Sequence, residues 1–76
     1  MDNNTSTSIG MQRGQAIAIA LLIRNPELGI HAQLESDGSG DTARHWLVIK
    51  APSDDVLSYV SAIAVNLKSA YGPWRV

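Results

Sequence analysis

Residues 29–50 read GIHAQLESDGSGDTARHWLVIK, and the expected topology of the chain follows from this stretch. It holds two short runs, 29–36 and 43–50, in which Ile, Leu, Val and Trp recur. Between them, residues 37–42 supply Asp, Gly, Ser and Thr, the residue types that favour turns. The pattern predicts an antiparallel β-hairpin.

The alternation of apolar and polar side chains predicts which residues of the two runs lie opposite each other. A slip of one residue would exchange the faces of a strand, so we expect Ser36 to pair with Ala43, which gathers the apolar residues on one face. That face pairs Ile30 with Ile49, Ala32 with Leu47 and Leu34 with His45. The other face pairs His31 with Val48, Gln33 with Trp46 and Glu35 with Arg44. The last of these is a favourable opposite-charge pair.

Residues 54–71 are predicted to form an α-helix with clear signals at both ends. Ser53 is the expected N-cap, and Asp54 and Asp55 place carboxylates in the first turn, where they oppose the helix dipole. Gly72-Pro73 follows the last turn and ends the helix. Apolar residues recur at three- and four-residue steps and form one stripe: Val56, Tyr59, Val60, Ile63, Leu67 and Ala70.

Residues 11–24 (MQRGQAIAIALLIR) fit either a strand or a helix. The alternation of Ile and Ala is typical of a strand, whereas Ala, Leu, Gln and Arg favour a helix. We favour the helix, which would be apolar almost all round and therefore buried between layers or between subunits. The prediction is an α+β domain of order α-β-β-α, an antiparallel hairpin packed by two helices. The alternative is a β-β-β-α meander with the same C-terminal helix.

The polar opening of the chain, MDNNTSTS, has nothing to bury. We therefore expect residues 1–8 to be a disordered tail and residues 9–76 to form a single domain. A domain this short buries only about 60% of the surface of its unfolded chain, and without cysteine no disulfide supports it. Association with a second copy is therefore expected. The closing residues, Trp74 to Val76, are expected to pack on the core or to form a short edge strand.

No residue pattern indicates catalysis, a metal site or a bound cofactor. The two histidines, His31 and His45, point to opposite faces of the predicted hairpin and so cannot share a metal ion or form a dyad. Residues 37–41 (DGSGD) lack the twelve-residue pattern of a calcium loop. The isolated glycines match neither a P-loop nor a dinucleotide fingerprint. We expect a protein that is not an enzyme and that has no cofactor.

Charge and hydropathy limit the expected partners. Six Lys and Arg against seven Asp and Glu give a net charge of −1, with no basic stripe that would neutralise phosphates, so nucleic acid is not expected as the main partner. The most apolar run, residues 16–23, is far shorter than the roughly 20 residues that span a bilayer. The absence of cysteine fits a reducing compartment, and we expect a cytoplasmic protein.

Trp46 lies on the more polar face of the predicted hairpin, beside Val48, His31 and Gln33. Trp is enriched among the residues that anchor protein interfaces, so these four residues are expected to form an interaction surface. The alternative is that the N-terminal segment or the C-terminal tail of the same chain covers the indole.

A lone hairpin leaves two unpaired strand edges, and a two-fold axis would join two hairpins into a four-stranded sheet. The order of an apolar helix, the Asn-Pro-Glu-Leu break at 25–28, a hairpin and an amphipathic helix resembles that of small proteins from bacteria and their phages. This resemblance implies no site residues. The sequence therefore predicts a non-enzymatic, homodimeric protein–protein interaction module. The alternative is a small nucleic-acid-binding regulator that uses Arg13, Arg24, Lys50 and Arg75.

Overall fold

The computed structural model describes residues 5–38, 40 and 43–71 of the 76-residue chain. The protein is an α+β domain with one antiparallel sheet and two helices, as predicted. Its elements, in chain order, are β1 (Thr5–Gly10), α1 (Arg13–Ile23), the short 3-10 helix η1 (Pro26–Leu28), β2 (His31–Asp37), β3 (Arg44–Ala51) and α2 (Asp54–Tyr71).

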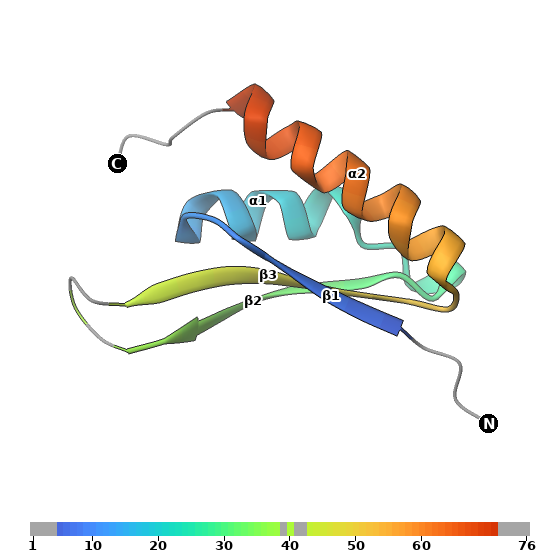
Figure 1. The fold of residues 1–76 in the computed structure, drawn as a ribbon, viewed down its shortest axis with the longest axis horizontal. Helices are drawn as coiled ribbons and strands as arrows, with labels where there is room; N and C mark the ends of the chain where they lie inside the picture. The colour runs from blue at the N-terminus through green and yellow to red at the C-terminus, as the bar shows by residue number, and fades with distance from the viewer. Residues whose placement is uncertain (1–4, 39, 41–42, 72–76) are drawn as a thin grey trace.

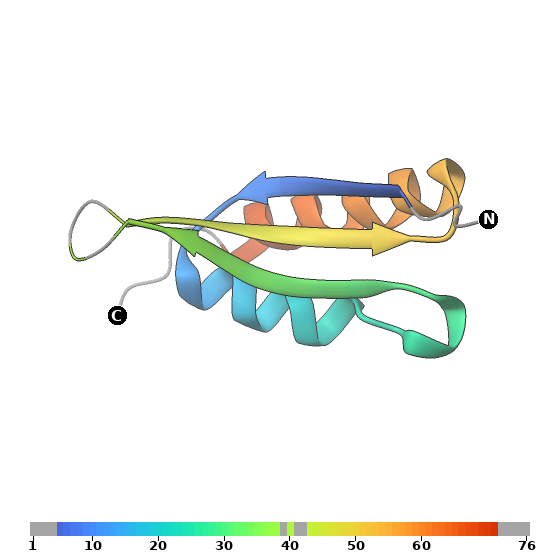
Figure 2. The ribbon, with the colours of Figure 1, turned by 90° about the horizontal axis from the view of Figure 1, so that it is seen from below.

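The three strands lie in the order β1-β3-β2, and β3 pairs antiparallel with both neighbours (Figure 2). Strands β1 and β2 are therefore parallel, with β3 inserted between them, which is a split β-α-β arrangement. Both helices cover the same face of the sheet (Figure 1). Helix α1 packs on β2 and β3, whereas α2 packs on β1 and β3. In the described part of the chain, no helix or strand covers the other face, which is called the open face below.

Both predicted helices are present. The segment that fitted either a strand or a helix is α1, and its alternating Ile and Ala residues do not make it a strand. Helix α1 ends where Arg24 turns to an extended conformation (ψ 139°) before Asn25-Pro26. Helix α2 spans Asp54–Tyr71, the predicted bounds, and the backbone N–H of Val56 donates to Oγ of Ser53 at 3.3 Å. Ser53 is therefore the N-cap, as predicted.

The prediction of a disordered tail over residues 1–8 is wrong for residues 5–8, which belong to β1. In β1, Thr5, Thr7 and Ile9 are half-buried, and the residues between them are exposed. Hydroxyl side chains carry little hydropathy, so the alternation was hidden, although threonine is a good strand former. Residues 1–4 and the closing segment Trp74 to Val76 lie outside the described residues.

The hairpin is present, but the predicted pairing is displaced by two positions. Asp37 pairs with Arg44, so Glu35 faces Trp46 rather than Arg44. The other observed pairs are His31 with Lys50, Ala32 with Ile49, Gln33 with Val48, Leu34 with Leu47 and Ser36 with His45. A displacement by two leaves every side chain on its predicted face. The hydropathy pattern therefore identified the faces correctly and could not identify the partners.

The core lies between the sheet and the two helices. Ile19 of α1 and Leu47 and Ile49 of β3 are its largest fully buried side chains. The other buried members of this core cluster are Met11, Ala16, Ala20, Ile30, Val60 and Ala64. Burying a large aliphatic side chain contributes about 1.5–3 kcal/mol. The central position of β3 explains its weight in the core, because both neighbouring strands shield its edges.

Candidate interaction surfaces

The structure places all four residues of the predicted interaction surface on the open face. His31 and Gln33 come from β2, and Trp46 and Val48 come from β3. His31 and Gln33 are exposed, and Gln33 lies directly opposite Val48 in the register. The open face therefore brings these four residues together.

Trp46 is half-buried between the two outer strands. Gly10 of β1 lies opposite it on one side and Glu35 of β2 on the other. A Cβ atom at Gly10 would meet no other atom within 4 Å, so the surface beside the indole is open on that side. Nε2 of Gln33 donates to Oε2 of Glu35 at 2.9 Å. Trp46 and Val48 are thus two large apolar side chains among polar neighbours, and the open face is not a continuous apolar patch.

A second surface, which sequence reasoning missed, is a groove between the end of α1, η1 and the first half of α2. The groove has a volume of about 480 Å³. It is called the apolar groove below, and its lining residues are Leu22, Ile23, Asn25, Leu28, Ile30, Asp55, Val56, Tyr59, Val60 and Ile63. Three of its large side chains are mostly exposed, Leu22 at 60%, Leu28 at 62% and Tyr59 at 71%.

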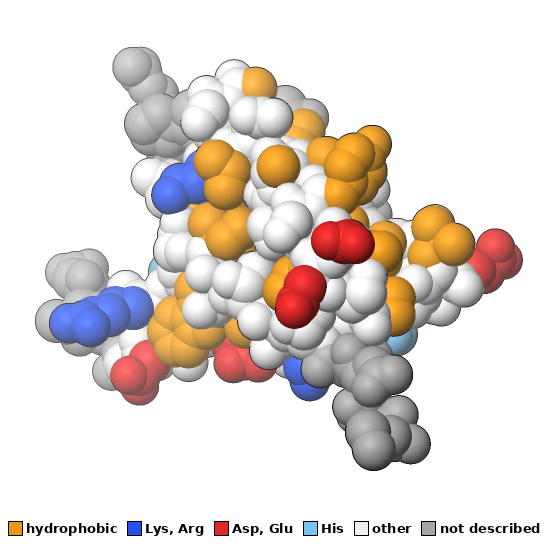
Figure 3. All heavy atoms as spheres, turned by 45° about the vertical axis from the view of Figure 1, so that its right-hand side comes forward, with side chains coloured by type: hydrophobic (Ala, Val, Ile, Leu, Met, Phe, Trp, Pro, Cys, Tyr) orange, Lys and Arg blue, Asp and Glu red, His pale blue; other side chains and the backbone are white. Residues whose placement is uncertain are grey.

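Apart from Val65, the large exposed apolar side chains of the described residues lie on α1, η1 and the adjoining flank of α2. Figure 3 looks toward the end where α2 begins and shows hydrophobic side chains beside acidic ones there. Ile17 and Leu21 of α1 are exposed as well, so the apolar surface extends along the outer side of this helix. Isolated exposed apolar residues are normal, whereas a contiguous group of them marks an interaction site.

One sequence signal pointed to this surface. Helix α1 is apolar almost all round, as expected, but it is not buried between layers, since Ile17, Leu21 and Leu22 on its outer side are exposed. No such signal in the sequence pointed to Tyr59. It belongs to the apolar stripe of α2, which is expected to be buried, but it lies at the edge of that stripe and is exposed. Its exposure depends on where α1 ends, which only the three-dimensional packing fixes.

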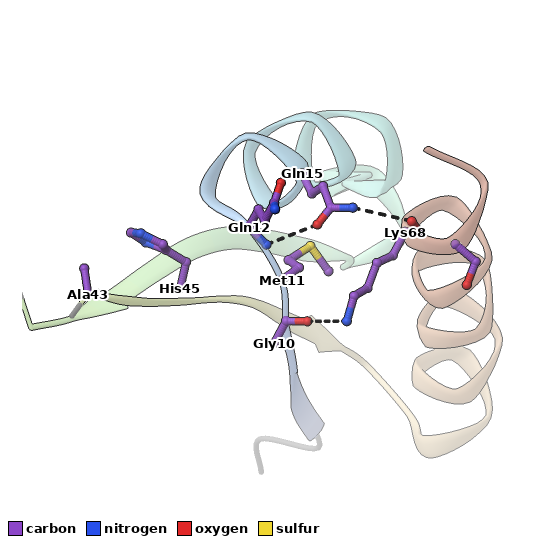
Figure 4. A pocket seen from close by; sticks show the side chains of 8 residues that line it. Gly10, Met11, Gln12, Gln15, Ala43, His45 and Lys68 are labelled. Atoms are coloured by element: carbon purple, nitrogen blue, oxygen red, sulfur yellow. Dashed lines mark hydrogen bonds between the residues drawn. The ribbon is translucent and has the colours of Figure 1, made fainter. Parts of the chain in front are cut away.

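A polar pocket of about 550 Å³ lies at the opposite end of the helical layer (Figure 4). Three hydrogen bonds hold its walls together. The backbone N–H of Gln12 donates to Oε1 of Gln15 at 3.1 Å, and Nε2 of Gln15 donates to the carbonyl of Lys68 at 3.4 Å. Nζ of Lys68 donates to the carbonyl of Gly10 at 2.6 Å. These bonds join the end of β1 and the start of α1 to the last turn of α2, and we interpret them as structural.

His45 lines this pocket on the helical side of the sheet, and His31 lies on the open face. The prediction that the two imidazoles point to opposite faces is therefore correct. Nδ1 of His45 lies 2.7 Å from Oγ of Ser36, its cross-strand neighbour. Within the described residues, no group of three His, Asp or Glu side chains is placed to hold a metal ion. Two residues of the DGSGD sequence, Ser39 and Asp41, lie outside that range.

The three described basic residues proposed for nucleic acid, Arg13, Arg24 and Lys50, do not gather on one surface. Arg13 and Arg24 flank the two ends of α1, about 16 Å apart along the helix axis. Lys50 lies on the open face, opposite His31, and Arg75 is outside the described residues. This arrangement forms no stripe that could follow a phosphate backbone.

None of the helices in the described part of the chain is both long enough and apolar enough to cross a membrane. In comparisons with known proteins, no family model matches the chain, and no curated protein or solved structure is significantly similar to it. The functional argument therefore depends on the surfaces described above.

Proposed function

We propose that this chain is a small, non-enzymatic protein–protein interaction module that acts as a homodimer in the cytoplasm. The observation that carries the proposal is the apolar groove, where Leu22, Leu28 and Tyr59 are each more than half exposed. Covering the exposed part of such a side chain contributes about 1–2 kcal/mol. A partner that fills the groove therefore gains several kilocalories per mole from these three residues. The absence of cysteine supports the assignment to a reducing compartment.

The open face supports the same function as a second contact surface. Trp46 is the type of residue that anchors interfaces, and Val48 lies two residues further along the same strand. Polar side chains surround both, as they do at the rim of many interfaces. We assign the larger share of partner binding to the apolar groove because its exposed apolar side chains adjoin one another.

The test is capture of proteins from a lysate of the source organism on the immobilised chain and on its surface variants. We expect Leu28→Ala and Tyr59→Ala each to weaken capture of the main partner at least about tenfold, because both truncate side chains whose large exposed part is buried only in the complex. Trp46→Ala should reduce binding by about 2 kcal/mol if the open face also contacts the partner. Ser58→Ala, an exposed polar position next to Tyr59, is the matched control.

Circular dichroism shows whether each variant keeps its fold. The proposal of partner binding fails if the wild-type chain and the Ser58→Ala control capture no more protein than Leu28→Ala, Tyr59→Ala and Trp46→Ala do.

A further inference from the structure

Strand β1 presents hydrogen-bonding groups along its outer edge. The N–H of Met11 donates to the carbonyl of His45 at 3.2 Å, which continues the register that pairs Ile9 with Leu47. In an antiparallel ladder, alternate residues bond to the neighbouring strand and the residues between them point their N–H and C=O groups away from it. Ser6, Ser8 and Gly10 therefore point theirs to the outer edge. The bond from Lys68 to the carbonyl of Gly10 agrees with this direction.

The two outer edges of the sheet differ in chemistry. The start of β2 is covered by Asn25, whose backbone exchanges hydrogen bonds of 2.9 and 3.0 Å with Ile30. Strand β2 also carries Glu35 and Asp37, and charged side chains protect an edge strand from pairing. The β1 sequence TSTSIG has no charge and no proline. In the described part of the chain, no strand pairs with the outer edge of β1.

We propose that a second copy of this chain pairs with β1 in the antiparallel direction, across a two-fold axis that passes midway between Thr7 and Thr7 of the second copy. This inference depends on the homodimer of the proposed function and names its interface. In this register Ser6 lies opposite Ser8 of the second copy, and Ser8 lies opposite Ser6 of the second copy. Each of these two pairs exchanges both backbone hydrogen bonds, because their groups already point outward. No like charges face each other, since β1 is uncharged.

The position of α2 agrees with the same axis. Helix α2 lies over β1 and β3 and runs in the direction of β1 (Figure 2), and Nζ of Lys68 bonds to the carbonyl of Gly10 (Figure 4). From Gly10 back to Thr7 is about 10 Å along a strand, and from Lys68 back to Ser61 is about 10 Å along a helix. Along the helix, Ser61 therefore lies at the level at which the two-fold axis passes beside Thr7.

The flank of α2 that faces this axis is complementary to itself. Residues three and four apart on a helix share a flank, so Lys68 shares its flank with Val65, Ser61, Leu57 and Asp54. Antiparallel packing centred on Ser61 places Asp54 opposite Lys68 of the second copy and Leu57 opposite Val65 of the second copy. Charges of opposite sign thus meet at both ends. Val65, which is 46% exposed in the single chain, becomes covered.

The spacing of the two helices also fits. Helix α2 lies over the boundary between β1 and β3, and neighbouring strands are about 4.8 Å apart. The two copies of α2 would therefore lie about 10 Å apart, which is the usual distance between packed helices. The product is a six-stranded sheet with its open faces on one side. Helix α1 lies over β2, away from the axis, so both apolar grooves stay available to a partner.

The test removes the N–H group that the second copy needs. Ser8→Pro deletes an outward-pointing donor and leaves the bonds to β3 in place, and proline is tolerated on edge strands of this kind. We expect dimerisation, measured by sedimentation equilibrium, to weaken at least about tenfold in Ser8→Pro. Ser8→Ala keeps the N–H group and is the matched control, which should dimerise as the wild-type chain does.

A disulfide provides a second test that does not depend on how well Ser8→Pro folds. The chain has no cysteine, so Thr7→Cys introduces the single thiol of the protein. Across the proposed axis, the two Thr7 positions form a non-hydrogen-bonded pair with Cα atoms about 4.5 Å apart, within the range that a disulfide bridges. Under mild oxidation, Thr7→Cys should become a covalent dimer, whereas Gln33→Cys on β2 should not.

The possible outcomes separate this inference from the proposed function. A wild-type dimer that Ser8→Pro leaves unchanged, or in which Thr7→Cys forms no disulfide, overturns the β1 interface and leaves the homodimer standing. A wild-type chain that stays monomeric overturns both. In that monomer, slow exchange of the Ser6 and Ser8 amides would show that a segment of the same chain covers the edge.

Discussion

The side chain of Gln15 joins the start of α1 to the last turn of α2 in the polar pocket. It is the one buried polar residue in the described part of the chain, with 3% of its surface exposed. Its Oε1 accepts from the backbone N–H of Gln12, the N-cap of α1, and its Nε2 donates to the carbonyl of Lys68. That carbonyl is among the last four of α2, which have no partner within the helix. The side chain of Gln15 therefore forms hydrogen bonds with backbone groups at the start of α1 and at the end of α2.

Replacement of Gln15 should cost stability rather than binding. We expect Gln15→Ala to lower the free energy of unfolding by about 1–3 kcal/mol, because it removes the side-chain partner of the partly buried N–H of Gln12 and carbonyl of Lys68. Urea unfolding followed by circular dichroism measures this change. Gln33→Ala, which removes an exposed glutamine, should change stability by less than about 0.5 kcal/mol. Equal losses in the two variants would contradict the role assigned to Gln15.

At the scale of elements, local signals predicted the helices and the faces of the hairpin. The N-cap of Ser53 and the acidic first turn marked the start of α2, and the alanine content of residues 16–20 favoured a helix for α1. Strand β1 was missed because its stability comes from pairing with β3, some 40 residues away, and not from its own hydropathy. The predicted pairing of β2 with β3 differs from the observed one by two positions, because a shift of two residues keeps every side chain on the same face and the hydropathy pattern cannot detect it.

The flank of α2 yields a prediction that depends on the proposed helix pair. Asp54→Lys would place a lysine opposite Lys68 of the second copy at both ends of the interface. We expect the dissociation constant of the dimer to rise about tenfold at low salt, with a smaller effect at high salt because ions screen the repulsion.

Asp55→Lys is the control for this charge change. It lies in the same helical turn and changes the net charge by the same amount. However, Asp55 lines the apolar groove on the other flank of α2. Asp55→Lys should therefore leave the dissociation constant within about twofold of the wild-type value, since it faces no charge across the proposed interface. Equal effects of the two substitutions on dimerisation, measured by sedimentation equilibrium, would argue against the helix pair.

At the scale of the whole molecule, the sequence predicted one surface and missed the other. His31, Gln33, Trp46 and Val48 do share the open face, because strand alternation alone decides that grouping. The apolar groove could not be predicted, since it forms where the end of α1, η1 and α2 meet. The predicted four-stranded sheet of two merged hairpins named no strand for the contact, and in the structure β1 occupies the outer edge of β3, so that edge is not free to join two copies. The outer edge of β1 takes its place in the proposed dimer.

The size of the molecule explains why a second copy matters. A standard interface covers about 800 Å² on each partner, roughly one seventh of the 5293 Å² accessible surface of this chain. The outer edge of β1, about 20 Å long, and the adjoining flank of α2, about 27 Å long, together offer the surface for such a contact. The dimer would add to the small core a contact that the single chain lacks.

Sedimentation equilibrium of the wild-type chain, carried out from low to tens-of-micromolar concentration, tests the homodimer most directly. The account predicts a mass that rises toward twice the 8.2 kDa of one chain as concentration increases. A single species of 8.2 kDa throughout this range would contradict it.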